Sequence, residues 1–194
     1  LDRAIAAVEK AHGNTPAGYS KDEYDYRRML ARDDFDAVLI ATPVDWHAVM
    51  SLDAMNAGKD VGSEVPACRT LEECRDLVRT KEKTGTRYML LENYVYTRVR
   101  MQIYNMARAG VFGDLYYAEC GYIHDCLALL FDSKGALTWR GEVRARLFGN
   151  TYPTHSIGPI SKMMSIHRGD RMAKLVAMMS APRSSHHYAV EQFG

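Results

Sequence analysis

The stretch AVLIATP, residues 37–43, decides the fold. Its first five residues are apolar without alternation, which is typical of a strand covered on both faces, so we expect a central strand over 37–41. Further strands are expected at 60–64 and, with apolar character, at 88–91, and segments with helical spacing separate the three. Strands that alternate with helices predict an α/β fold with a parallel sheet and right-handed crossovers.

The helices around these strands are expected over 2–11, 20–31, 45–57 and 70–85. Ser20 and Asp45 are the predicted N-caps of the second and third helices, and a short strand is expected at 17–19. Thr70 and Glu73 have the spacing of a capping box, which opens the fourth helix. Helical spacing predicts that this last helix turns four side chains toward the core: Leu71, Cys74, Leu77 and Val78.

After Asn93 the pattern changes, and we place a domain boundary near Tyr96. The sequence predicts helices over 98–109 and 157–166, the first with Val99, Ile103 and Met106 buried. Longer strands are expected over 115–122 and 174–179, with a loop over 132–150. Long strands flanked by a few helices predict a second α/β unit with a mixed or antiparallel sheet.

Composition and charge exclude several classes of protein. The 194 residues include 25 basic and 24 acidic side chains, a balance that argues against a polybasic nucleic-acid binder. No apolar run approaches the ~20 residues that a membrane helix needs, so no membrane span is expected. The four cysteines form no C-x-x-C pair, and we expect free thiols and no metal site, including around 120–126. The chain begins at Leu1 on a helical pattern, which we interpret as a fragment.

Three loops at the carboxyl ends of the predicted parallel strands should line one crevice, where such sheets bind ligands. Carboxylate and carboxamide groups there could bind a ribose or a nicotinamide amide, although the same residues could merely cap loops. No G-x-G-x-x-G motif occurs in the chain, and we expect it upstream of Leu1. The candidate cofactor-binding residues are Thr42, Pro43, Asp45, Trp46, His47, Glu64, Val65, Asn93 and, from the second half, Tyr152.

The pattern of residues 37–43, then His47, then GKDV at 58–61 running into Glu64-x-Pro66, resembles the Gfo/Idh/MocA family of NAD(P)-dependent sugar oxidoreductases. The family motif at this point is Glu-Lys-Pro, and this chain has Val65 in place of the lysine. The Glu-Val-Pro version of this motif, the segment ENY at 92–94 and the segment YPTHSIGP at 152–159 together make the chain similar to glycoside hydrolase family 109. The resemblance implies NAD as cofactor and an α-N-acetylgalactosaminide-like carbohydrate as substrate.

The resemblance also implies a site and a route. His155 and Tyr152 are the candidate catalytic residues, and the candidate substrate-binding residues are Tyr122, Tyr152, Pro153, Thr154 and His155. Arg140, which follows Trp139, could hold a phosphate or a sugar hydroxyl. In the implied reaction, sugar C3 is oxidised by NAD+, the C2 proton is removed, the C1 substituent leaves, water adds, and the ketone is reduced again. The alternatives are ordinary roles: a helix cap for His155, a core aromatic for Tyr122 and a solvated arginine for Arg140.

The family also implies a domain division: the later part of an NAD-binding Rossmann domain without its first strands over 1–96, and the first part of a substrate domain over 97–194. Two other functions stay open, a sugar or cyclitol dehydrogenase that releases NADH, and an inactive fragment or noncatalytic sugar-binding module. A homo-oligomer is possible, and family members are either exported from bacteria through a twin-arginine signal or cytoplasmic.

Overall fold

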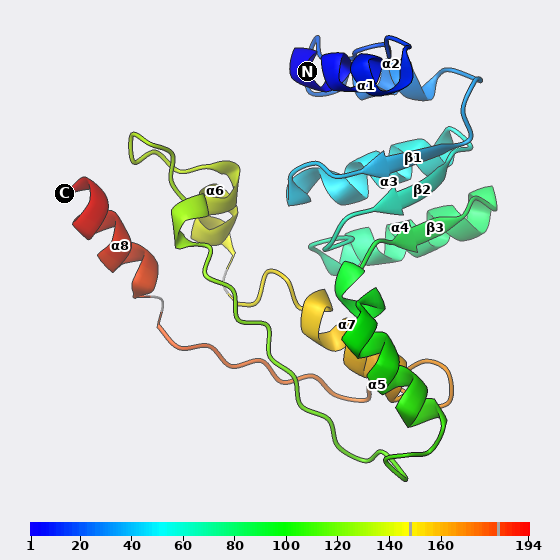
Figure 1. Cartoon of the computed structure of the whole chain (residues 1–194), viewed down its shortest axis with the longest axis vertical. Helices are drawn as coiled ribbons and strands as arrows, with labels where there is room; N and C mark the ends of the chain where they lie inside the picture. The colour runs from blue at the N-terminus through cyan, green and yellow to red at the C-terminus, as the bar shows by residue number, and fades with distance from the viewer. Residues whose placement is uncertain (148, 182) are drawn as a thin grey trace.

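A computed structural model describes residues 1–147, 149–181 and 183–194 (Figure 1). Its sheet is parallel and three-stranded, in the order β1-β2-β3. The strands and the helices that connect them confirm the predicted α/β alternation: β1 (Ala37–Ile40), η1 (Val44–Trp46), α3 (His47–Asn56), β2 (Asp60–Ser63), α4 (Leu71–Thr84) and β3 (Tyr88–Leu90).

The core lies where α3 covers the sheet. Met55 and Ala54 are almost fully buried against Val61 and Ile40, and burial of a side chain the size of Met55 contributes about 1.5–3 kcal/mol. Leu39, on the other face of the sheet, is 81% exposed. In the described three-stranded sheet, β1 lies at the edge and not at the expected central position. A continuous apolar run does not reveal which face receives a helix.

The start of α4 follows the predicted capping box. Thr70 Oγ1 accepts a hydrogen bond from the backbone N–H of Glu73 at 3.1 Å, and Glu73 Oε2 accepts from the N–H of Thr70 at 3.0 Å. Of the four side chains expected inward, only Leu77 is buried, while Leu71, Cys74 and Val78 are exposed. The helix packs on α3, and the spacing of its apolar side chains predicts a wider buried face than the one that forms.

The N-terminal segment differs from the expectation. The helix α1 (Asp2–His12) forms and ends at Gly13 in the left-handed conformation, as predicted. The second helix, α2 (Tyr26–Leu30), is much shorter than expected, and residues 17–19 form no strand. The carboxylate of Asp25 accepts hydrogen bonds from the N–H of Lys21 and from Arg28, which fixes a turn where the helix was expected to begin at Ser20.

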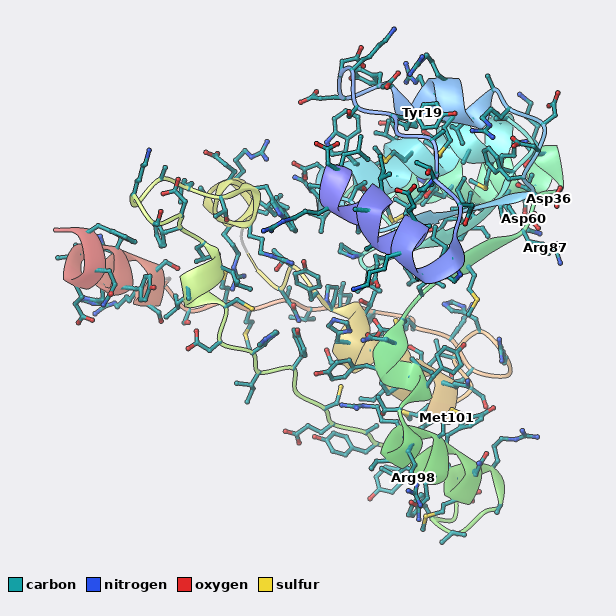
Figure 2. All side chains as sticks on the ribbon, turned by 45° about the horizontal axis from the view of Figure 1, so that its top comes forward. Tyr19, Asp36, Asp60, Arg87, Arg98 and Met101 are labelled. Carbon is teal, nitrogen blue, oxygen red and sulfur yellow. The ribbon has the colours of Figure 1, made fainter. Side chains whose placement is uncertain are left out.

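The amino ends of β2 and β3 are joined by one ion pair. Figure 2 shows Asp60 and Arg87 side by side at this end of the sheet. Asp60 accepts from the backbone N–H of Arg87 at 2.8 Å and from its Nε at 2.7 Å. These hydrogen bonds lower the pKa of Asp60, the backbone bond most. The opposite, carboxyl ends of the strands are left free to carry the loops of the candidate site.

In the second half, η2 (Asn93–Tyr96), α5 (Arg98–Arg108) and α7 (Thr154–Met163) pack together. Of the predicted inward side chains of α5, Val99 is 64% exposed and Ile103 37%. The segment 132–150, expected to be a loop, contains α6 (Trp139–Arg146), while η3 (Leu127–Leu129) contacts α8 (Ser184–Phe193). None of the helices in the described residues is long and apolar enough to cross a bilayer.

The strands expected over 115–122 and 174–179 do not form, so the described part of the second half has no mixed or antiparallel sheet. Both segments run as extended chain (Figure 1). Their apolar side chains remain exposed, for example Tyr116 and Met178 at 94% each. A strand needs a neighbour to pair its backbone groups, and these segments have no such neighbour among the described residues.

Candidate functional site

Two cavities meet at the carboxyl ends of the strands. The smaller, of about 310 Å³, lies at the ends of β1 and β2 and reaches α6 and α7; the larger, of about 540 Å³, lies between the loop after β2, α6 and the start of α7. Five residues line both: Val44, Trp139, Arg140, Tyr152 and His155. The residues of the first half, expected to bind the cofactor, and those of the second half, expected to bind the substrate, therefore lie side by side where the two cavities meet.

His155 lies in the first turn of α7 and is bonded to a carboxylate that follows β3. Its Nδ1 is 2.8 Å from Oε1 of Glu92, and the two side chains are only 10% and 7% exposed. Glu92 Oε1 also accepts from the N–H of Tyr94 at 3.0 Å, which fixes the carboxylate. Because a carboxylate only accepts, the proton lies on Nδ1, and Nε2 of a neutral imidazole is left as an acceptor.

Three tyrosines surround the imidazole of His155. The ring centroids of Tyr94 and Tyr122 each lie 4.6 Å from it, and the ring of Tyr152 is stacked at 5.8 Å with an interplanar angle of 6°. Burial is the largest cause that raises the pKa of Tyr122, so its phenol is neutral near pH 7 and can donate. The Tyr122 oxygen also lies 2.7 Å from Nδ1 of His124.

Arg140 connects α6 to Tyr152. Its Nη1 donates to the Tyr152 oxygen at 2.9 Å, and its guanidinium lies 4.2 Å from the ring centroid of Trp139. An arginine has no acceptor, so the phenol oxygen must accept from it. The phenolic hydrogen of Tyr152 is therefore free to be donated to a ligand.

His47 holds the cofactor side of the site together. It is 1% exposed, and its ring nitrogens lie 2.8 Å from the carbonyl oxygens of Thr42 and Pro66, which follow β1 and β2. Both nitrogens thus lie at hydrogen-bond distance from backbone carbonyls, and a neutral ring donates to one of the two. The other predicted cofactor residues that line the smaller cavity are Thr42, Pro43, Glu64, Val65, Asn93 and Tyr152.

Three predicted site residues lie outside both cavities. Asp45 pairs with Arg69 and, at 3.0 Å, with Arg146 from α6. It is not the predicted N-cap of α3, since Trp46 occupies that position. Trp46 packs edge-to-face on Tyr24 with ring centroids 5.4 Å apart, and Thr154 lines a separate cavity of about 260 Å³. Of the predicted substrate residues, Tyr122, Arg140, Tyr152, Pro153 and His155 line the larger cavity.

Glu92 is a site residue that the sequence analysis did not select. It lies in the ENY segment at 92–94, and a carboxylate directly after an apolar strand is a signal that could have identified it. Among the described residues, no group of three His, Cys, Asp or Glu side chains is placed to hold a metal ion.

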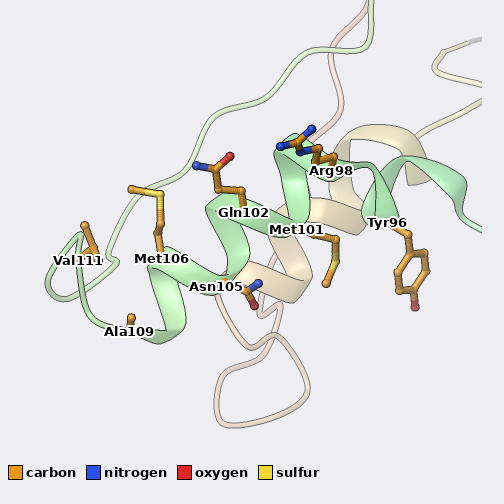
Figure 3. Close-up of a pocket in the computed structure, with 8 residues that line it drawn as sticks. All are labelled: Tyr96, Arg98, Met101, Gln102, Asn105, Met106, Ala109 and Val111. Carbon is orange, nitrogen blue, oxygen red and sulfur yellow. The ribbon is translucent and has the colours of Figure 1, made fainter.

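A further hollow of about 750 Å³ runs along α5 (Figure 3). Figure 3 shows that its side chains, among them Met101, Met106 and Asn105, come from η2, α5 and the residue Val111 beyond it. It contains no histidine, carboxylate or cysteine to move a proton. The candidate site is therefore the pair of cavities around His155.

Comparison with known proteins gives two family matches. Residues 2–92 match the oxidoreductase family with an NAD-binding Rossmann fold, and residues 96–194 match the C-terminal domain of glycosyl hydrolase 109. Glycosyl hydrolase family 109 proteins from Shewanella sp. strains W3-18-1 and ANA-3 are 40% and 42% identical over 195 residues, covering all of this chain. The chain spans 42% of the length of either relative.

The apo scyllo-inositol dehydrogenase of Lactobacillus casei resembles this fold with a TM-score of 0.51, at 22% identity over 59% of this chain and 33% of that one. A probable dehydrogenase from Thermotoga maritima has a TM-score of 0.50 at 18% identity, over 58% and 33% of the two chains. These likenesses concern the fold. The expected relationship to both families is confirmed, and the NAD-binding family match confirms the expected cofactor.

Proposed function

Because the chain belongs to glycosyl hydrolase family 109 and its first part matches an NAD-binding Rossmann fold, we propose that the protein is an NAD-dependent glycosidase that acts on an α-N-acetylgalactosaminide. Residues 1–96 form the later part of the cofactor domain, and residues 97–194 form the first part of the substrate domain. The observation that carries the proposal is the Glu92–His155 pair at the junction of the two cavities.

The smaller cavity suits a dinucleotide. It lies at the carboxyl ends of parallel strands, where such ligands bind, and the polar side chains of Glu64 and Asn93 line it. The hydroxyl of Thr42 at its edge is buried and has no hydrogen-bond partner among the described residues, as expected for a group that a ligand satisfies. When bound, NAD supplies the acceptor for the hydride from the sugar and later returns it.

His155 is the base in this proposal. Its Nε2 faces no partner among the described residues and can take the proton from the carbon next to the oxidised one, which allows the C1 substituent to leave. Glu92 then stabilises the imidazolium that forms. Tyr152 donates its phenolic proton to the departing C1 oxygen, and Arg140 orients that phenol. Water then adds its hydroxyl to C1 and returns a proton to Tyr152, while His155 returns its proton to C2.

Position 65 separates this function from a dehydrogenase that uses a lysine in the same loop. Val65 is 5% exposed and has no group that transfers a proton, so proton transfer falls to the second half of the chain. This observation favours the hydrolase.

The test is to incubate the full-length protein with an aryl α-N-acetylgalactosaminide and to follow both the released phenol and the absorbance of reduced nicotinamide. We expect phenol release without net NADH, and deuterium from heavy water at C2 of the sugar product. His155→Asn should abolish both the phenol release and the incorporation of deuterium. The control His186→Asn, at an exposed position in α8, should keep both. Net NADH without phenol release would show a dehydrogenase, and sugar binding without either signal would show a noncatalytic module.

A further inference from the structure

The larger cavity has a strongly basic lining. Three guanidinium groups line it, from Arg69 in the loop after β2 and from Arg140 and Arg144 on α6. His124 and His155 line it as well. No aspartate or glutamate is among its described lining residues. A neutral sugar does not require this lining.

The positive charge of the cavity is only partly neutralised. Arg69 pairs with Asp45, but the same carboxylate also binds Arg146, so these three groups keep one net positive charge. Arg140 contacts the phenol of Tyr152 and the ring of Trp139, which are both neutral. Arg144 donates to the carbonyl oxygen of Gly149 at a long 3.4 Å. Within the described residues, neither Arg140 nor Arg144 has a carboxylate within ion-pair distance.

Arg140 and Arg144 are one turn apart on α6, so their guanidiniums project from the same side of the helix. Like charges at this spacing repel each other. An anion between them would remove this repulsion, and the planar guanidinium matches the paired oxygens of a sulfate, phosphate or carboxylate. Arg140 is bound to Tyr152 beside His155, so Arg144 is the cation placed farther from the reacting groups.

We propose that the larger cavity binds a sugar that carries an oxyanion group, with Arg144 as the residue that recognises the anion. This inference rests on the proposed function and specifies its substrate class. A cavity of about 540 Å³ is within the ordinary range for small-molecule sites, which run from about 300 to 1,000 Å³, and can hold a substituted monosaccharide. The phosphates of the dinucleotide are the other source of such an oxyanion, and the experiment separates the two.

The test is calorimetric titration of the full-length protein with N-acetylgalactosamine 6-sulfate, with N-acetylgalactosamine and with NAD. We expect the sulfated sugar to bind at least about tenfold more tightly than the neutral one, and the difference to shrink with added salt. Arg144→Gln should remove the difference without changing the affinity for the neutral sugar or NAD. Arg144→Lys should restore part of it, and the control Arg3→Gln, at an exposed position in α1, should leave it intact.

Equal or weaker binding of the sulfated sugar, or no binding of either sugar, overturns this inference. A loss of NAD affinity in Arg144→Gln also overturns it, because the arginine then serves the phosphates of the cofactor. Circular dichroism of each variant shows whether it is folded. These titrations measure binding without turnover, so a failure of glycoside cleavage is a separate result that bears on the proposed function.

Discussion

Glu92 and His155 are 63 positions apart in the sequence, and the Glu92 carboxylate lies 2.8 Å from Nδ1 of the His155 imidazole. One residue follows the last strand of the parallel sheet and the other begins a helix of the second half. The bond fixes which nitrogen of the ring faces the cavities. It therefore joins the two halves of the chain at the point where we propose that a proton is transferred.

Replacing Glu92 with glutamine should keep the hydrogen bond and remove the negative charge. Because the charge stabilises the imidazolium of His155, we expect kcat on an aryl α-N-acetylgalactosaminide to fall by about 100-fold or more. Glu92→Gln combined with His155→Asn should be no worse than His155→Asn alone, since the two residues act as one unit. Glu82→Gln, on the exposed side of α4, is the matched control. A kcat for Glu92→Gln within twofold of the unmodified protein would contradict the role of Glu92.

Tyr152→Phe removes the phenol that accepts from Arg140 and donates to the ligand. The ring still stacks on His155, so the fold should persist while kcat falls by about 10²-fold, the range of a lost proton donor. Steady-state kinetics measures this effect, and Tyr116→Phe, at a 94% exposed position, is the control. Should KM rise while kcat stays constant, Tyr152 binds the substrate but does not assist the reaction.

Cys68 should be the least reactive of the four thiols. Burial, and then the neighbouring Cys74 thiol with its sulfur 2.8 Å away, raise the pKa of Cys68 to about 12. At pH 8 the Cys68 thiol is then almost entirely protonated, and the thiolate is the form that alkylates. Iodoacetamide labelling followed by peptide mass spectrometry should modify the exposed Cys120 first and Cys68 last. Equal rates at the two sites would show that Cys68 is not protected.

Tyr26 should make the stability of the fold depend on pH in the alkaline range. Its hydroxyl donates to Asp53 Oδ2 at 2.6 Å, and burial followed by this carboxylate raises its pKa to about 12 from 10.0. The folded state keeps the phenolic proton more tightly, so the contribution is complete below pH 10 and is lost as the pH rises toward 12.

Tyr26→Phe should therefore lower the free energy of unfolding by about 1 kcal/mol at pH 8, and by progressively less between pH 10 and 12. Urea denaturation at several pH values measures the difference between the two proteins. A difference that is constant across this range would mean that the phenol titrates alike in the folded and unfolded states.

The parts of the fold that could be predicted from the sequence are those that local contacts determine. The capping box of Thr70 and Glu73 involves neighbours within one turn, and the ends of α1 and α4 depend on single glycines. The missed features depend on distant partners. The apolar run of β1 does not show that Leu39 is exposed among the described residues, and the apolar side chains of 115–122 do not supply the neighbour that a strand needs.

The candidate site shows the same division. The sequence analysis selected His155, Tyr152, Tyr122 and Arg140, and the structure places all four around the larger cavity. Asp45, selected as a ligand of the cofactor, instead binds two arginines, one of which is 101 positions away. A salt bridge over such a distance leaves no periodic signal. The partnership of Glu92 with His155 was missed for the same reason.

On the cofactor side of the site, His47 connects the loops that follow β1 and β2. One buried ring lies between the carbonyl oxygens of Thr42 and Pro66, so it links the two loops that form this rim of the cavity. A flat ligand that enters this rim meets backbone groups already in position, and little binding free energy is spent on ordering them. The group that links the two sides of this rim is therefore the His47 imidazole, which is almost entirely hidden from solvent.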